Sequence, residues 1–213
     1  MKPAPSAART DCSATAFRFV VAVSILVLAG CTGTPDGVQA VNDFELERYL
    51  GTWYEIARLD HPFERGLTDV TAEYRPREGG GIEVVNSGFD PEVGERRSAV
   101  GKAFFVEDPS LGMLEVSFFG PFYGGYNVIA LDAEHYCWSM VAGPNRSYLW
   151  ILGRTPELDP EVVRRLTDRA AALGFPVGEL IWVDQARREE NSNDSERCAP
   201  LSRARRGNEI TLD

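Results

Sequence analysis

The chain has 213 residues, of which 44% are hydrophobic and 10% aromatic, a composition typical of a globular protein rather than a disordered or fibrous one. Its formal charge is −10, from 22 basic and 32 acidic residues. An acidic surface repels phosphate groups, which argues against nucleic acid as a partner. The two histidines, His61 and His135, are too few for a typical multi-histidine metal site, so we expect neither a metal nor a cofactor.

Residues 1–30 have the features of a secretory signal peptide. An apolar run at residues 19–29 follows Lys2, Arg9 and Arg18, and it is too short to span a membrane, which takes about 20 apolar residues. The run ends in Leu28-Ala29-Gly30-Cys31, which resembles the lipobox of bacterial lipoproteins. The resemblance implies cleavage before Cys31, a diacylglyceryl group on its sulfur and an acyl chain such as palmitate on its amino group. The alternative is an ordinary signal peptide followed by an unmodified cysteine.

Residue 32 is threonine, whereas an aspartate there holds lipoproteins of this kind in the inner membrane. We therefore expect the protein on the periplasmic side of the bacterial outer membrane. Cleavage would remove three basic residues and one acidic residue, which takes the formal charge from −10 to −12. Acyl chains hold a protein to a bilayer without help from positive charge, so the acidic surface is no obstacle to anchoring.

Composition divides the mature chain into three parts. Residues 31–43 are small and polar and include glycine and proline, so we expect a flexible, lipidated tether. Residues 44–185 carry the hydrophobic patterning of a folded domain. Residues 186–213 are charged and poor in apolar side chains, which predicts a disordered tail.

Short segments of the domain alternate apolar and polar residues and are separated by turn residues. Such alternation predicts half-buried strands. The clearest segments are residues 68–74, 81–88, 114–119, 126–132, 136–141 and 148–154. About eight strands in succession, with no helix between them, predict an antiparallel meander that closes into a β-barrel.

A helix is predicted after the strands. Asp159 is a suitable cap, Pro160 fits the first helical position, apolar residues recur at helical spacing up to Leu173, and Gly174 follows. The single apolar stripe predicts that the helix packs on the outside of the barrel. Residues 180–185 predict one more short strand.

Three segments resemble the signature motifs of the lipocalin family, in the order of that family. The first is Gly51-Thr52-Trp53, the second lies at residues 126–132 and the third at residues 148–156. The resemblance covers residues 41–185, and residues 117–132 are similar to the bacterial outer-membrane lipocalins, which are relatives of apolipoprotein D. It implies an all-β fold, an eight-stranded up-and-down antiparallel barrel with a C-terminal helix outside, that holds a small hydrophobic ligand. It also implies structural roles for Gly51, for Trp53 at the closed end of the barrel and for Arg154 across it.

Parity along the strands predicts which side chains face the cavity. If Arg154 faces inward, so do Leu152 and Trp150 on the same strand. The same counting places Tyr126, Val128 and Ala130 on one face. The predicted ligand-binding wall, which is mostly apolar and suits an acyl chain, consists of Val70, Ala72, Tyr74, Leu114, Val116, Phe118, Tyr126, Val128 and Trp150. The alternative is that these side chains fill the barrel.

Three further features have open interpretations. Glu55 shares a face with Trp53. It either contacts the ligand headgroup or donates a proton, or else it hydrogen-bonds to backbone near the barrel floor. We expect the hydrogen bond to backbone, because a buried acid needs a partner. The aromatic run at residues 118–126 is a hydrophobic rim, a patch for a membrane or partner, or a packed turn. Cys137 and Cys198 form a disulfide or remain two free thiols.

The leading hypothesis is a lipid-anchored periplasmic lipocalin that binds a fatty acid or lysophospholipid for lipid transport, storage or membrane maintenance. No G-x-S-x-G motif is present and two histidines offer little for acid–base chemistry, so we predict no catalytic residue and no enzyme. One alternative is a lipid-modifying or isomerase enzyme inside the barrel, and another is a structural lipoprotein with a filled barrel. The sequence leaves open whether the protein forms a homodimer.

Overall fold

The computed structural model describes residues 33–186 and Cys198. The expected signal peptide at residues 1–30, the lipidation site Cys31 and nearly all of the expected tail at residues 186–213 lie outside the described residues. Within the described part of the chain, no helix is long and apolar enough to cross a membrane.

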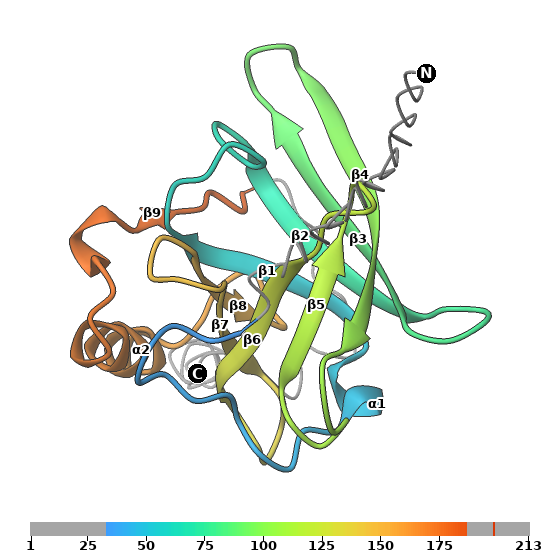
Figure 1. The fold of residues 1–213 in the computed structure, drawn as a ribbon. Helices are drawn as coiled ribbons and strands as arrows, with labels where there is room; N and C mark the ends of the chain where they lie inside the picture. Colours follow the sequence, from blue (N-terminus) through green and yellow to red (C-terminus); the bar gives the residue numbers. More distant parts are fainter. Residues whose placement is uncertain (1–32, 187–197, 199–213) are drawn as a thin grey trace, which may run out of the picture.

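The core of the fold is a closed antiparallel barrel of eight strands, as predicted (Figure 1). Consecutive strands are hydrogen-bonded neighbours, and β1 pairs with both β8 and β2, which closes the sheet and leaves no long free edge. The strands are β1 (Gly51–Arg58), β2 (Thr68–Pro76), β3 (Ile82–Asp90), β4 (Glu95–Phe105), β5 (Met113–Ser117), β6 (Gly124–Leu131), β7 (Trp138–Ala142) and β8 (Leu149–Gly153).

Two strands are absent from the segments that alternation identified: β1, which carries the Gly51-Thr52-Trp53 motif, and β4. Residues 95–100, the first half of β4, are exposed and carry the sequence ERRSAV, which has no apolar alternation. In Figure 1 the β3–β4 hairpin extends beyond the rest of the barrel, at the end opposite the short helix α1 (Leu46–Tyr49). Neither face of the sheet is covered there, so burial imposes no period-two pattern on the sequence.

Two hydrophobic clusters lie on the two faces of the barrel wall. The inner cluster includes Trp53, Leu114 and Leu152 and fills the closed end. The outer cluster, which includes Met140 and Ile151, is covered by Leu166 and Ala170 of helix α2 (Pro160–Ala172). Asp159 caps α2 by accepting a hydrogen bond from the Glu161 amide at 2.8 Å, and the helix lies outside the barrel as expected.

After α2 the chain forms a short 3₁₀ helix η1 (Val177–Glu179) and strand β9 (Ile181–Trp182). Residues 181 and 182 pair with Arg58 and Ala57 of β1, beyond the part of β1 that pairs with β2. The predicted strand at residues 180–185 is therefore shorter than expected, because only the end of β1 has free backbone groups to pair with.

Two β-bulges change the parity of the wall. In β1 the register with β8 shifts between Glu55 and Ala57, and in β6 the register with β7 shifts between Val128 and Ala130. Both Ile129 and Ala130 consequently join the outer cluster. The prediction that Ala130 shares the face of Tyr126 and Val128 is wrong, because a bulge places two residues opposite one and reverses the alternation beyond it.

The segment expected as a flexible tether is packed against the barrel from Gly33 onward. Val38 is buried, the Val41 amide donates to the Val128 carbonyl at 2.8 Å, and the Gly112 amide donates to the Val41 carbonyl at 2.9 Å. Residues 33–43 thus cover β6 and the β4–β5 loop, because Val38 and Val41 provide apolar anchors that a purely compositional argument overlooks.

Candidate ligand-binding site

A cavity of about 660 Å³ occupies the barrel and opens between the loops that follow β1, β5 and β7. Eight of the nine predicted wall residues line it: Val70, Ala72, Tyr74, Leu114, Val116, Phe118, Tyr126 and Trp150. The ninth, Val128, is fully buried in the inner cluster below the cavity and does not line it. The prediction that Trp150 and Leu152 of β8 face inward is confirmed, since both line the cavity.

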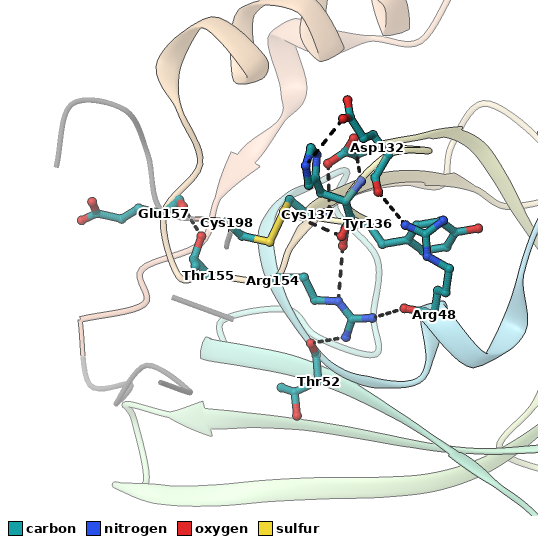
Figure 2. The surroundings of a disulfide bond; sticks show 11 residues. Arg48, Thr52, Asp132, Tyr136, Cys137, Arg154, Thr155, Glu157 and Cys198 are labelled. Atoms are coloured by element: carbon teal, nitrogen blue, oxygen red, sulfur yellow. Dashed lines mark hydrogen bonds and ion pairs between the residues drawn. A yellow bond between two sulfur atoms is a disulfide. The ribbon is translucent and has the colours of Figure 1, made fainter. Parts of the chain in front are cut away.

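The closed end of the barrel is built on Trp53. Its indole nitrogen donates to the Tyr49 carbonyl at 2.8 Å, and the guanidinium carbon of Arg154 lies 4.0 Å from the centre of its ring. Arg154 also donates to the carbonyl oxygens of Arg48 at 2.7 Å and Thr52 at 2.9 Å (Figure 2). A third bond goes to the Leu50 carbonyl at 2.9 Å. These contacts tie α1 and the start of β1 to the end of β8, and neither Trp53 nor Arg154 lines the cavity.

Three tyrosine hydroxyls form a polar patch just above the floor. The Tyr126 hydroxyl lies 2.8 Å from that of Tyr49 and 2.7 Å from that of Tyr74, and Tyr49 also contacts Ser139 Oγ at 3.2 Å. Burial raises the pKa of Tyr49 to about 12 and those of Tyr74 and Tyr126 well above the ordinary tyrosine value. The cavity therefore ends in neutral hydroxyls.

A buried, hydrogen-bonded arginine–glutamate pair lies in the wall closer to the mouth. Arg58 Nη1 donates to Glu55 Oε1 at 2.6 Å, and Arg58 Nη2 donates to the Glu64 carbonyl oxygen at 2.6 Å. The bulge in β1 makes this pairing possible, because residues three apart in a regular strand face opposite sides. The expectation that Glu55 bonds to backbone near the floor is wrong: its partners are side chains, and they lie toward the open end.

Glu64, in the β1–β2 loop, is folded back into the barrel beside this pair. Its carboxylate lies 3.1 Å from His61 Nε2 and accepts hydrogen bonds from Trp150 Nε1 at 3.3 Å and from Asn86 Nδ2 at 3.3 Å. Both His61 and Glu64 are buried although they belong to a loop. The cluster formed by residues 55, 58, 61 and 64 therefore holds the β1–β2 loop across part of the mouth.

The pKa values of the two carboxyl groups in this cluster are shifted in opposite directions. Burial and the negative charge of Glu64 raise the pKa of Glu55 well above the ordinary value, against the opposing effect of Arg58. Burial alone would also raise the pKa of Glu64, but hydrogen bonds from His61, Glu55 and Trp150 outweigh it and lower that pKa. Glu55 therefore keeps its proton to higher pH than an ordinary carboxyl group does, and Glu64 ionises first.

Sequence reasoning singled out Glu55 but missed Arg58, His61 and Glu64. No local pattern could have found them, because their meeting depends on a bulge and on the path of a loop. In residues 33–186 no group of three His, Cys, Asp or Glu side chains is arranged to hold a metal ion.

A disulfide joins Cys137, in the β6–β7 loop, to Cys198 (Figure 2). Cys137 lies at the closed end of the barrel, where its carbonyl accepts a hydrogen bond from the Arg154 amide at 2.9 Å. Of residues 187–213 only Cys198 is described, and the bond ties it to the floor.

Comparison with known proteins shows the family to which the chain belongs. A model described as a lipocalin-like domain matches residues 44–185. Insecticyanin from the tobacco hornworm, Manduca sexta, has the same fold, with a TM-score of 0.60 at 23% identity over 79% of this chain and 91% of that one. The chain belongs to the lipocalin family, whose members are generally non-catalytic binding proteins.

Within the family the similarity is to bacterial lipoproteins. The chain is 52% identical over 167 residues to the outer membrane lipoprotein Blc of Vibrio cholerae, covering 78% of this chain and 97% of that protein. It is 53% identical over 163 residues to Blc of Escherichia coli K12, covering 76% and 92%. Mouse apolipoprotein D is more distant, at 33% over 151 residues, covering 68% and 78%. The protein is an outer-membrane lipoprotein of the Blc-like lipocalins.

Proposed function

We propose that this lipoprotein binds an amphiphile with one long acyl chain, a fatty acid or a lysophospholipid, and serves its transport, storage or use in membrane maintenance without changing it chemically. The observation that carries the proposal is the cavity of about 660 Å³, which lies within the range of about 300–1,000 Å³ typical of small-molecule sites. Its walls are mainly aliphatic and aromatic side chains, which suit a hydrocarbon chain and offer it no charged partner at depth.

The polarity of the cavity predicts how the ligand enters. The deep end presents neutral tyrosine hydroxyls, and an ionised headgroup placed there would lose its water without gaining an opposite charge. The opening presents Arg65 and Arg97, whose side chains are 63% and 61% exposed and are paired with Asp60 and Asp90, each at 2.6 Å. We infer that the acyl chain enters first and that a carboxylate or phosphate stays at the mouth near these arginines.

The His61–Glu64 pair is the arrangement on which an enzymatic function would depend. The polar groups of Glu64 are directed to the protein, however: its carboxylate contacts His61, Trp150 and Asn86, and its backbone carbonyl accepts from Arg58. A general base must be free to reach a proton of its substrate. The pair is better explained as the attachment of the β1–β2 loop, which supports binding rather than catalysis.

Displacement of a fluorescent fatty acid from the purified protein tests the proposal. We expect saturable binding of one ligand per barrel, competed by fatty acids and lysophospholipids. Ala72→Trp and Val116→Trp, which fill the cavity, should weaken binding at least roughly tenfold, whereas Ala172→Trp on the exposed face of α2 should leave it unchanged. Absence of saturable binding to any acyl lipid would favour a structural role instead.

Mass spectrometry of the recovered ligand separates binding from catalysis. We expect the ligand to leave the protein unchanged after prolonged incubation. Conversion of the ligand that is lost in both His61→Gln and Glu55→Gln would instead establish an enzyme whose acid–base groups lie in the cluster of residues 55, 58, 61 and 64.

A further inference from the structure

The open end of the barrel exposes three phenylalanine side chains. Phe63, in the β1–β2 loop, is 70% exposed, and Phe119 and Phe122, in the β5–β6 loop, are 70% and 73% exposed. All three border the cavity opening. Val93, 57% exposed, belongs to the β3–β4 turn. Figure 1 shows this turn at the end of the barrel opposite α1. Large apolar side chains gathered on one end of a protein indicate a surface that is covered by a partner or a membrane.

Two loops at the closed end expose carboxylates and few large apolar side chains. The β4–β5 loop exposes Glu107 and Asp108, and the β6–β7 loop exposes Glu134. Val106 is the one large apolar side chain among the described residues of these two loops that is strongly exposed, at 38%. Carboxylates repel anionic headgroups and lose hydration in a bilayer interface, so the closed end is unsuited to contact with a membrane.

The first described residues, which directly follow Cys31 and Thr32 in the sequence, are held on the side of the barrel near the mouth. The Gly33 carbonyl accepts a hydrogen bond from Asn127 Nδ2 at 3.1 Å, and the same amide donates to the Ala142 carbonyl at 3.3 Å. Ala142 ends β7, and the next residue, Gly143, lines the cavity opening. The Asp36 carbonyl is also held at this level, by Arg146 Nη2 of the β7–β8 loop at 2.6 Å.

Covalent distances then limit where an anchor on Cys31 can lie. Cys31 is two residues from Gly33, and two extended residues span at most about 7 Å. Along β6, Asn127 is three residues from Gly124, the strand residue next to the loop with Phe119 and Phe122, which is about 10 Å. An acyl anchor on Cys31 is therefore within reach of a bilayer that contacts the aromatic loops.

We propose that the lipoprotein docks with its open end on the periplasmic leaflet of the outer membrane, with Phe63, Phe119 and Phe122 in the bilayer interface. The inference depends on acylation of Cys31 but on no particular ligand. Rings at this depth lose contact with water while the barrel stays outside the hydrocarbon, as in proteins that lie on a membrane surface. The cavity then opens directly onto lipid, so an acyl chain passes between the bilayer and the barrel without crossing water.

Site-specific photocrosslinking of the complete, acylated lipoprotein in vesicles of phosphatidylethanolamine and phosphatidylglycerol tests the orientation. Benzoylphenylalanine replaces Phe119 or Phe122 at the mouth, and Val106 at the closed end as the matched exposed apolar control. We expect phospholipid adducts at positions 119 and 122 in at least roughly tenfold excess over position 106, because the excited ketone reacts only with groups that it touches.

The alternatives give distinct products. Equal lipid labelling at all three positions, or labelling mainly at position 106, overturns the proposal. Adducts at position 119 or 122 that join two protein chains overturn it in favour of a protein interface on the rim. Because the adducts form with bulk phospholipid, the outcome is independent of the displacement assay, and a protein that binds no fatty acid can still show the proposed orientation.

Discussion

The guanidinium group of Arg154 stacks over Trp53, with 4.0 Å between its carbon atom and the ring centre, and this pair closes the barrel. A cation over an indole face contributes about 0.5–2 kcal/mol, depending on desolvation. The larger role of Arg154 is to satisfy backbone carbonyls of α1 and β1 that would otherwise be buried without a hydrogen bond. The two residues act together as the structural floor above which the ligand cavity lies.

Arg154→Ala is expected to destabilise the protein strongly. It leaves the carbonyl oxygens of Arg48, Leu50 and Thr52 without their partner, and each unsatisfied buried group costs about 1–3 kcal/mol. The free energy of unfolding, measured by urea denaturation, should fall by at least about 3 kcal/mol. Arg164→Ala, on the exposed face of α2, is the control and should change it little. Equal effects of the two substitutions would contradict the role of Arg154.

Tyr126→Phe tests the hydroxyl patch at the bottom of the cavity. The substitution removes the group that contacts both Tyr49 and Tyr74, and the loss should cost about 1–2 kcal/mol of unfolding free energy without changing the volume of the core. Tyr123→Phe is a suitable control, since the Tyr123 hydroxyl has no hydrogen bond to another described residue. An unchanged stability of Tyr126→Phe would show that water or ligand replaces the hydroxyl.

The Cys137–Cys198 disulfide closes a loop with a sequence separation of 61 residues. In the chain-entropy model such a cross-link stabilises the folded state by about 4 kcal/mol, because it restricts the unfolded chain. Cys198→Ser should therefore lower the free energy of unfolding by up to that amount. Cys137→Ser should have nearly the same effect, and the double variant should be no worse than the single ones. Additive losses would show that the thiols contribute independently of the bond.

Glu55→Gln should alter the pH dependence of stability. Burial and Glu64 raise the pKa of Glu55 in the folded protein. At pH values above the ordinary carboxyl range, the folded protein therefore retains a proton that the unfolded chain has already released. The stability contributed by protonated Glu55 is complete at low pH and is lost as pH rises through the pKa of the folded state. Glutamine keeps an acceptor for Arg58 and a donor for Glu64 but has no proton to lose.

The stability of Glu55→Gln relative to the native protein should consequently increase as pH rises above the ordinary carboxyl range, as followed by urea denaturation at each pH. Glu107→Gln, at an exposed position outside the cluster, should give a curve parallel to that of the native protein. A parallel curve for Glu55→Gln as well would mean that the buried carboxyl is ionised in the folded state.

The sequence alone determined the barrel, the external helix and most of the cavity wall, and the reason is periodicity. Wherever one face of a strand is buried and the other is not, alternation records the inward side, as it does for Trp150 and Leu152 on β8. Capping chemistry did the same for α2, where Asp159 and Pro160 mark the start. The resemblance at Gly51-Thr52-Trp53 added the first strand and the role of Trp53 at the closed end of the barrel, neither of which periodicity indicated.

The tertiary structure decided everything that depends on a break in that regularity. Bulges in β1 and β6 turned Arg58 inward and Ala130 outward, and solvent on both faces removed the signal of the β4 half-strand. The meeting of Glu55 with Glu64 and His61 joins a strand to a loop, so no spacing in the sequence encodes it. The path of residues 33–43 along the wall is likewise a matter of packing, and it sets the side of the barrel from which the chain leads to Cys31.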